Sequence, residues 1–182
     1  MEIRGNKVIL RTMEEQDQEM LLGLIQDQEI TRVTGGYSSP SSYEPQIQWP
    51  CSWEDSADSL RSIIADKENP EIGLGIILLS HVDPQNGIAE LSIKLGKSVR
   101  GMGYGQDAVN ILVSYGFREL GLNSICSHIL ESNTASRRLF EKCGFRQNGL
   151  QKGRTGQEGH CRSVCVYIIK KEDISRTSVY NF

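Results

Sequence analysis

The stretch that most constrains this chain is a glycine-rich turn, Arg100-Gly101-Met102-Gly103-Tyr104-Gly105. Before it, residues 88–95 alternate between apolar and polar side chains, which predicts a strand with one buried face. After it, apolar residues recur at helical spacing from 108 to 120, which predicts an amphipathic helix. Such a turn presents unpaired backbone N–H groups at the positive end of the helix dipole. It is therefore a predicted phosphate site, to which Arg100 would add a fixed positive charge.

Two common phosphate-binding loops fit this turn poorly. A P-loop requires Lys-Ser or Lys-Thr directly after its last glycine, whereas Gly105 is followed by Gln106 and Asp107. A dinucleotide-binding loop requires a further glycine at the position that Gln106 occupies, and it normally opens the first βαβ unit of a domain. The pattern present is Arg-x-x-Gly-x-Gly, and a tight turn that binds nothing is the alternative.

A second motif occupies residues 131–145, with the sequence Glu-Ser-Asn-Thr-Ala-Ser-Arg-Arg-Leu-Phe-Glu-Lys-Cys-Gly-Phe. Asn133 is a good helix N-cap, Gly144 is suited to a left-handed C-cap, and Leu139 and Phe140 supply an apolar stripe. One predicted helix and one predicted strand separate this motif from the glycine-rich turn. The two motifs at this separation resemble the GNAT acetyltransferase superfamily, most closely the branch with ribosomal-protein N-terminal and spermidine acetyltransferases.

The resemblance implies an α+β fold in which helices flank one mixed sheet, with the element order β-α-α-β-β-β-α-β-α-β-β. Residues 1–174 are expected to form a single domain, and residues 175–182 a loose tail. The two central parallel strands are expected to splay apart and admit the cofactor. The sequence patterns place strands at 7–11, 60–66, 71–82, 88–95, 124–130, 145–155 and 161–170, and helices at 14–26, 43–57, 105–119 and after Asn133.

The cofactor implied by the resemblance is acetyl-CoA, used as a co-substrate without a metal ion. The backbone of the strand at 88–95 is expected to pair with the pantetheine amides as an added strand would, and one N–H there would polarise the thioester carbonyl. The turn would hold the diphosphate. The expected cofactor-binding residues are Ser92, Ile93, Lys94, Leu95, Arg100, Gly101, Met102, Gly103, Tyr104, Gly105, Gln106, Asn133, Ser136 and Arg138.

Acetyl transfer to an amine also needs a base, because amines are mostly protonated at neutral pH. Glu90 is the predicted base, since strand alternation places it on the face opposite Leu91 and Ile93. In the resembling family, a glutamate on this strand often has this role. The alternative is a carboxylate that merely pairs with a neighbour on the sheet surface.

For the leaving thiolate, the chain departs from the family pattern. Many relatives carry a tyrosine as general acid at the position of Phe140, which has no proton to give. The ribosomal-protein N-terminal acetyltransferases use a serine three residues after the asparagine, which corresponds to Ser136, and a second glutamate, which is replaced by Thr155. Resemblance thus makes Ser136 the candidate acid. The alternatives are an ordinary first-turn serine and protonation by water.

Other side chains that could take part in catalysis or binding also have structural interpretations. His128 lies in a buried-strand pattern and is predicted to be a satisfied core histidine, whereas His81 and His160 lie beside turns without an acidic partner in the sequence. Three aromatic residues are expected either to line the acceptor pocket or to be core residues: Tyr37, Trp49 and Trp53.

Charge is distributed unevenly along the 182 residues, whose net charge is −3. Between residues 12 and 58 there are ten acidic residues and a single base, Arg32, while basic residues gather in the later half. An acidic acceptor side would suit a cationic amine; solvated acidic helices are the alternative interpretation. Five cysteines without Cys-x-x-Cys spacing indicate reduced thiols, and the lack of a long apolar run or signal-peptide pattern predicts a cytoplasmic protein.

The predicted function is acetyl transfer from acetyl-CoA to a primary amine by direct attack in a ternary complex. A polyamine, an amino sugar and a protein N-terminus all remain open as acceptors, as does a homodimeric state. No basic stripe with interleaved aromatic residues indicates nucleic acid, and no membrane partner is expected. Two alternatives are a non-catalytic CoA-binding module of the same fold and a nucleotide-binding domain of another fold.

Overall fold

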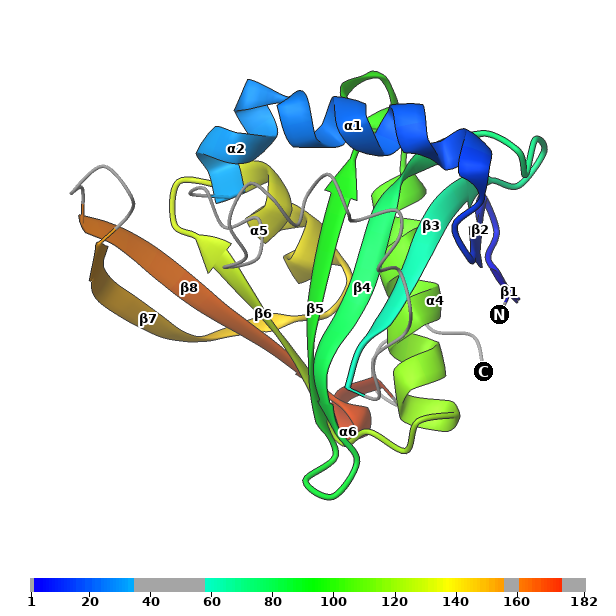
Figure 1. Cartoon of the computed structure of the whole chain (residues 1–182). Helices are drawn as coiled ribbons and strands as arrows, with labels where there is room; N and C mark the ends of the chain where they lie inside the picture. Colours follow the sequence, from blue (N-terminus) through cyan, green and yellow to red (C-terminus); the bar gives the residue numbers. More distant parts are fainter. Residues whose placement is uncertain (1, 35–57, 156–160, 175–182) are drawn as a thin grey trace.

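The computed structural model describes residues 2–34, 58–155 and 161–174, arranged around one sheet (Figure 1). The sheet has eight strands in the order β1-β2-β3-β4-β5-β6-β8-β7. Every neighbouring pair is antiparallel except β5 and β6, which are parallel. The strands are β1 (Glu2–Arg4), β2 (Val8–Arg11), β3 (Leu60–Asp66), β4 (Gly73–Asp83), β5 (Ile88–Leu95), β6 (Ser124–Leu130), β7 (Arg146–Thr155) and β8 (Cys161–Lys170).

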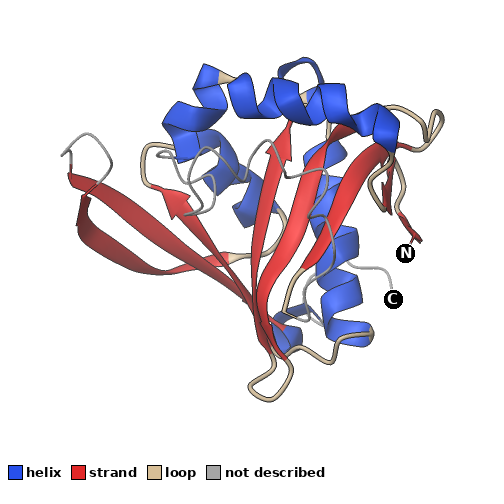
Figure 2. Ribbon diagram, in the orientation of Figure 1, coloured by secondary structure: helices blue, strands red, loops and turns tan. Residues whose placement is uncertain are grey.

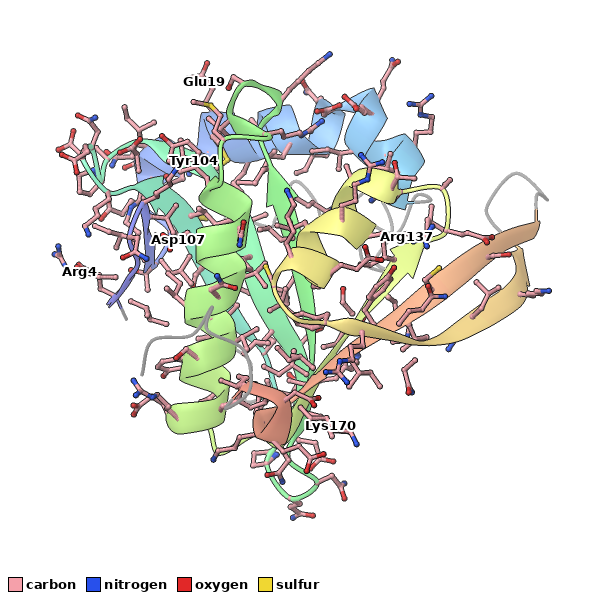
Figure 3. All side chains as sticks on the ribbon, turned by 180° about the vertical axis from the view of Figure 1, so that it is seen from behind. Arg4, Glu19, Tyr104, Asp107, Arg137 and Lys170 are labelled. Carbon is pink, nitrogen blue, oxygen red and sulfur yellow. The ribbon has the colours of Figure 1, made fainter. Side chains whose placement is uncertain are left out.

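Helices cover both faces of this sheet (Figures 1 and 2). Helices α1 and α2 cross one face, and α4 and α5 lie against the other, as the view from behind in Figure 3 confirms. The helices are η1 (Glu15–Asp17), α1 (Gln18–Gln26), α2 (Gln28–Thr34), η2 (Lys97–Val99), α4 (Tyr104–Arg118), α5 (Thr134–Lys142) and α6 (Lys171–Ile174). No helix in the described ranges has both the length and the hydrophobicity needed to cross a bilayer.

Two apolar clusters hold these layers together. The larger lies between the sheet and α4, where Ala89 and Leu91 of β5 are buried in one cluster with Val109 and Leu112. The smaller lies on the opposite face, where Leu21 and Leu24 of α1 and Ile30 of α2 cover Ile63 and Ile76. Strand alternation therefore places Leu91 toward α4 and Glu90 on the face that carries α1 and α2.

The predicted mixed α+β fold is confirmed, with differences near the N-terminus. The helix expected at 43–57 lies outside the described residues, as do the loose tail at 175–182 and three aromatic residues expected at the acceptor pocket: Tyr37, Trp49 and Trp53. The second helix that the structure contains is α2, which the sequence analysis missed because its seven residues are too short for a clear helical period. Strand β1 and helix α6 were not predicted either.

A buried ion pair anchors the first helical segment to the sheet. Arg11 of β2 donates to both carboxylate oxygens of Asp17, at 2.7 and 2.9 Å, and their side chains are 9% and 1% exposed. Asp17 also accepts the backbone N–H of Glu14, at 2.8 Å. The side-chain hydrogen bond from Arg11 holds the two charges together, and the pKa of Arg11 is raised accordingly. The ion pair thus fixes the start of α1 at the C-terminal end of β2.

Helix α5 is held to the sheet through a buried tyrosine of β8. The hydroxyl of Tyr167 accepts a hydrogen bond from Arg137 Nε, at 3.1 Å, and donates to Glu141 Oε1, at 2.8 Å. Both partners lie on α5, one helical turn apart, and Figure 3 shows Arg137 on that helix. Because the ring of Tyr167 is fully buried, these bonds fix the helix at a defined place over β6 and β8.

Candidate active site

Strands β5 and β6 pair only at their beginnings and then separate. The three register pairs are Ile88 with Ser124, Ala89 with Ile125, and Glu90 with Cys126. Beyond this point β6 continues to pair with β8 alone, and Figure 1 shows the two central strands diverging. The expected splay is confirmed. From Leu91 onward, the edge of β5 that faces β6 has no strand partner among the described residues, so its N–H and C=O groups can receive an extended ligand.

The glycine-rich turn lies at the end of this open edge. Gly101 and Gly103 have φ values of 76° and 88°, a left-handed conformation that glycine adopts without a steric penalty. Gly105 packs against Leu95, where an added Cβ would lie 2.9 Å from its Cδ1 atom. The first helical bond of α4 runs from Asp107 N to the Gly103 carbonyl, at 3.1 Å. The N–H groups of residues 104–106 therefore precede the helical ladder and form a candidate anion site.

Arg100 does not point its charge freely at this anion site. Its guanidinium nitrogens lie 2.9 Å from Asp27 Oδ2 and 3.1 Å from Glu29 Oε2, and its Nε donates to the Leu95 carbonyl, at 3.1 Å. Two carboxylates from the junction of α1 and α2 thus compensate the charge that the sequence analysis assigned to phosphate. The arginine instead links the glycine-rich turn to the junction of α1 and α2.

A second cation at the turn is Lys7, which the sequence analysis did not single out. Its Nζ donates to the Met102 carbonyl, at 2.9 Å, and lies 6.0 Å from the ring centroid of Tyr104. Asp107 holds it there by accepting the backbone N–H groups of Lys7 and Val8, at 2.7 and 3.0 Å. Figure 3 shows Tyr104 and Asp107 at the start of α4. No local pattern could reveal this contact, because the partners are about a hundred residues apart in sequence.

The predicted base, Glu90, stands where the strands begin to separate, and two imidazoles flank its carboxylate. His128 Nδ1 of β6 lies 2.9 Å from Oε1, and His81 Nδ1 of β4 lies 3.6 Å from Oε2. The Glu90 side chain is 30% exposed, so the carboxylate is accessible from the face that carries α1 and α2.

Two sequence predictions about the histidines are therefore wrong. His128 is not a core histidine, because it projects from the solvent-accessible face of β6 and pairs with Glu90. His81 does have an acidic partner, because a bulge in β4 brings it to Glu90. Both contacts join different strands, so only the pairing register could reveal them. His160 lies outside the described residues.

The start of α5 closes the other side of the diverging strands. Asn133 is its N-cap, as predicted, and accepts the Ser136 N–H at 3.1 Å, while its Nδ2 donates to the Val33 carbonyl of α2 at 3.4 Å. Ser136 is half-buried in the first turn, and Arg138 is exposed. Phe140, at the position of the family tyrosine, is buried in edge contact with Phe145, with centroids 4.9 Å apart.

Three further groups near the site have shifted pKa values. Burial lowers the pKa of Lys94, which is half-buried four residues beyond Glu90 on the same face of β5. Burial, and secondarily the charge of Glu90, raise the pKa of Cys126. Burial also raises the pKa of Cys143 to about 12. These thiols are therefore poor nucleophiles at neutral pH. No cluster of three described His, Cys, Asp or Glu side chains could hold a metal ion.

Comparison with known sequences identifies the family. Residues 7–146 match the sequence profile of the Acetyltransferase (GNAT) domain, which is more than half of the chain. The chain belongs to the GNAT acetyltransferase family. An uncharacterised N-acetyltransferase of Bacillus licheniformis is 28% identical over 92% of this chain and 94% of its own length. The human alpha/beta-tubulin-N-acetyltransferase 9 is 29% identical over 68% of this chain and 64% of its own length.

Solved structures of the family have the same fold. A spermidine N-acetyltransferase from Vibrio cholerae, in complex with CoA and spermine, superposes with a TM-score of 0.77 at 20% identity, over 91% of this chain and 96% of that one. A putative ribosomal-protein-serine acetyltransferase from the same organism gives a TM-score of 0.71 at 18% identity, over 93% and 97%. The predicted resemblance and the acetyltransferase class are confirmed, and a nucleotide-binding domain of another fold is excluded.

The contact between Arg100 and Asp27 makes stability depend on pH in a defined direction. Burial opposes the ionisation of Asp27, but hydrogen bonds from the Ile30 and Glu29 N–H groups and from Arg100 outweigh it and lower its pKa. The ionised carboxylate therefore stabilises the fold above its unfolded pKa of about 3.9, and this contribution is lost as the pH falls through the folded pKa.

We accordingly expect Asp27→Asn to lower the melting temperature at neutral pH and to have an effect that shrinks progressively as the pH falls below about 4. Asparagine can still cap α2, so the substitution removes mainly the charge. Thermal unfolding of both proteins across this pH range measures the difference. A difference in melting temperature between the two proteins that stays the same at all pH values would contradict an ionic contribution.

Proposed function

We propose that this chain transfers the acetyl group of acetyl-CoA to a primary amine, by direct attack within a ternary complex. The observation that carries this proposal is the open edge of β5, which runs from the flanked carboxylate of Glu90 to the glycine-rich turn at the start of α4. The unpaired edge of β5 thereby connects the proposed basic group with the proposed anion site. An acyl donor that carries a diphosphate at its far end fits this spacing.

The cofactor would lie along that edge. Its diphosphate would accept hydrogen bonds from the backbone N–H groups of Tyr104, Gly105 and Gln106. The nearby positive charge would come from Lys7 rather than Arg100, because Arg100 is paired with carboxylates. Its pantetheine amides would pair with the backbone of residues 92–95 in the manner of an added strand. A backbone N–H of β5 would then polarise the thioester carbonyl as negative charge develops on its oxygen.

The chemistry needs one proton removed and one supplied. The Glu90 site would take the proton from the incoming ammonium group, and Ser136 at the start of α5 would protonate the leaving thiolate. Direct attack by the amine is favoured over an acetyl-cysteine intermediate, because burial and Glu90 keep the thiol of Cys126 protonated. The protein would therefore act by positioning and proton transfer alone.

The acceptor is an amine of a small molecule or of a protein N-terminus. The named relatives include enzymes for spermidine, for tubulin and for a ribosomal protein, so the family relationship leaves all these classes open. The acidic character of the α1–α2 region is a weaker guide than the sequence suggested, because Arg100 offsets one of the two negative charges of Asp27 and Glu29.

Cofactor binding is tested with two matched glycine variants. Gly101 and Gly121 both have positive φ values, 76° and 67°, and neither has an atom within 4 Å of an added Cβ. Alanine at either position carries the same backbone strain of about 1–2 kcal/mol, but only Gly101 belongs to the turn. We expect both variants to melt lower, and only Gly101→Ala to raise the Kd for CoA, by about tenfold (about 1.4 kcal/mol).

Titration calorimetry with CoA measures these affinities, with ATP and NAD as comparison ligands. Equal affinity for CoA in the two variants would contradict the assignment of the turn. Turnover is then measured as thiol release with a panel of polyamines, amino sugars and peptides. Tight CoA binding without turnover on any amine would favour the non-catalytic module instead.

The role of Ser136 is tested by Ser136→Ala, with Ser132→Ala as the control in the exposed turn just before α5. We expect Ser136→Ala to lower kcat about tenfold, with the KM for acetyl-CoA unchanged. The loss should be smaller than for the base, because thiols with a pKa near 8–9 are themselves fair leaving groups. Equal kcat values in the two variants would leave water as the proton donor.

A further inference from the structure

Three adjacent strands deliver one ionisable side chain each to a single point of the sheet. Glu90 comes from β5, His81 from β4 and His128 from β6, and each imidazole presents Nδ1 to a different oxygen of the carboxylate. The shorter contact, 2.9 Å to His128, is a hydrogen bond; the longer one, 3.6 Å to His81, is within ion-pair range. Because Nδ1 of His128 is engaged by Glu90, its Nε2 is the ring nitrogen left to act as a base.

The two histidines lie on opposite sides of Glu90 with respect to the opening between the strands. His128 stands two residues beyond Cys126, the register partner of Glu90, so it lies about 6.6 Å farther along β6, where β5 has already moved away. His81 follows Ser80, the β4 partner of Glu90, in the direction of the paired ends of the strands. Only His128 therefore borders the cleft into which acceptor and thioester must enter.

The position of His81 depends on an irregularity in β4. The register between β4 and β5 shifts between Ser80 and Asp83, and His81 has a φ of 51°, the sole positive value among the described residues other than glycine. Left-handed backbone is unfavourable for residues with a Cβ, and bulges commonly redirect a side chain next to an active site. This bulge brings His81 to the second oxygen of Glu90 although 80% of its side chain is exposed.

Few other titratable groups face this cluster. Cys126 of β6 lies opposite Glu90, and burial keeps its thiol protonated. On β5 itself, Lys94 is four residues away, about 13 Å along the strand. Within the described part of the chain, α1 and α2 contribute no charged contact to Glu90. The carboxylate is therefore controlled by its two imidazoles.

We propose that His128 is the catalytic base, that Glu90 orients it, and that His81 positions the carboxylate of Glu90. This inference rests on the proposed acetyl transfer. An N–H bond of the ammonium group breaks and an N–H bond forms at His128 Nε2, while Glu90 compensates the charge of the imidazolium. The neutral amine then attacks the thioester, so that a C–N bond forms and the C–S bond breaks. Ser136 gives its proton to the leaving thiolate and regains the one that the attacking nitrogen loses as the amide forms. The imidazolium finally releases its proton to solvent.

Ordinary acid–base strengths favour this division of roles over a carboxylate acting alone. A general base is most effective when its pKa lies near the working pH. In model peptides the pKa of imidazole is about 6.5 and that of a glutamate about 4.3, so an imidazole is the stronger of these two bases. A carboxylate that accepts Nδ1–H fixes the tautomer with Nε2 free, which is the arrangement that the 2.9 Å contact provides.

The experiment separates the two candidate bases with isosteric variants. In His128→Asn, the amide nitrogen replaces Nδ1 and can still donate to Glu90, but no group remains to accept a proton at Nε2. We expect kcat to fall about 10²–10⁴-fold, with the KM for acetyl-CoA unchanged and the pH dependence of kcat altered. In His128→Ala, added imidazole should restore part of the rate.

His81→Gly tests the positioning role, because glycine adopts a positive φ without strain and leaves the second oxygen of Glu90 without its imidazole. We expect a loss in kcat of less than about tenfold, with the pH dependence of kcat retained, since His128 remains as the base. Asn86→Ala, in the turn between β4 and β5, is the control; its side chain contacts Asp83 and not Glu90.

Near-normal kcat in His128→Asn, or failure of imidazole to rescue His128→Ala, would overturn the proposal and leave Glu90 as the base. A loss in kcat as large in His81→Gly as in His128→Asn would assign the proton transfer to His81 instead. If the wild-type protein binds CoA but acetylates no amine, the proposed function fails first. That result is distinct from an active enzyme that tolerates His128→Asn.

Discussion

Glu90→Gln is expected to lower kcat for acetyl transfer by about 10²–10⁴-fold while the Kd for CoA stays within a factor of two or three. Glutamine keeps the size of the side chain but carries no negative charge, so it can neither accept a proton at neutral pH nor compensate an imidazolium at His128. The pH dependence of kcat should change as well, because the imidazole of His128 loses the negative charge of Glu90 beside it. Steady-state kinetics across pH with an active amine measure both effects.

Glu19→Gln is the matched control, because it makes the same chemical change on an exposed residue of α1 that Figure 3 shows at the rim of the molecule. Its kinetics should equal those of the wild-type protein. If Glu90→Gln turned over amines at the wild-type rate at every pH, Glu90 would have no part in proton transfer. The Glu90–His128 contact would then be only a surface pair of the sheet.

The largest effect on stability is expected from Asp17→Asn, which should lower the free energy of unfolding by about 3–5 kcal/mol. The substitution leaves the guanidinium of Arg11 buried without its counter-charge, and it weakens the acceptor of the Glu14 N–H. For a domain of this size, each 1 kcal/mol lowers the melting temperature by about 2–4 °C. Chemical denaturation and thermal unfolding measure the loss.

The control is Glu2→Gln, which breaks an ion pair of similar length, 2.6 Å to Arg4, whose side chains are 50% and 68% exposed. We expect a change below about 1 kcal/mol, because water solvates both groups when the pair is broken. The double substitution Arg11→Met with Asp17→Leu should recover much of the stability that Asp17→Asn loses, since no buried charge then remains. Equal losses in Asp17→Asn and Glu2→Gln would show that burial does not decide the effect.

Local chemistry explains why much of the fold could be predicted. The alternation in residues 88–95, the capping side chain of Asn133 and the left-handed Gly144, with a φ of 85°, are properties of a few neighbouring residues. Each was assigned from the sequence and is present in the structure. The open edge of β5 followed from the family resemblance, and the three register pairs with β6 confirm it.

The sequence did not reveal contacts that depend on a distant partner. Arg100 was assigned to phosphate from its place in the motif, and its pairing with two carboxylates more than seventy residues earlier was not foreseen. Lys7, which no motif contains, lies at the turn because Asp107 binds the backbone beside it. Neither pairing leaves a local signature, since side-chain contacts across elements are set by how those elements pack.

The sequence by itself determined the order of the main strands and helices, the glycine-rich turn and the position of Glu90 on the polar face of its strand. Only the tertiary structure decided what surrounds that carboxylate. The register of three strands, and one bulge that shifts it, place His81 and His128 against Glu90. A shift of one residue in either pairing would turn these side chains to the opposite face, and no pattern within a single strand encodes which register is formed.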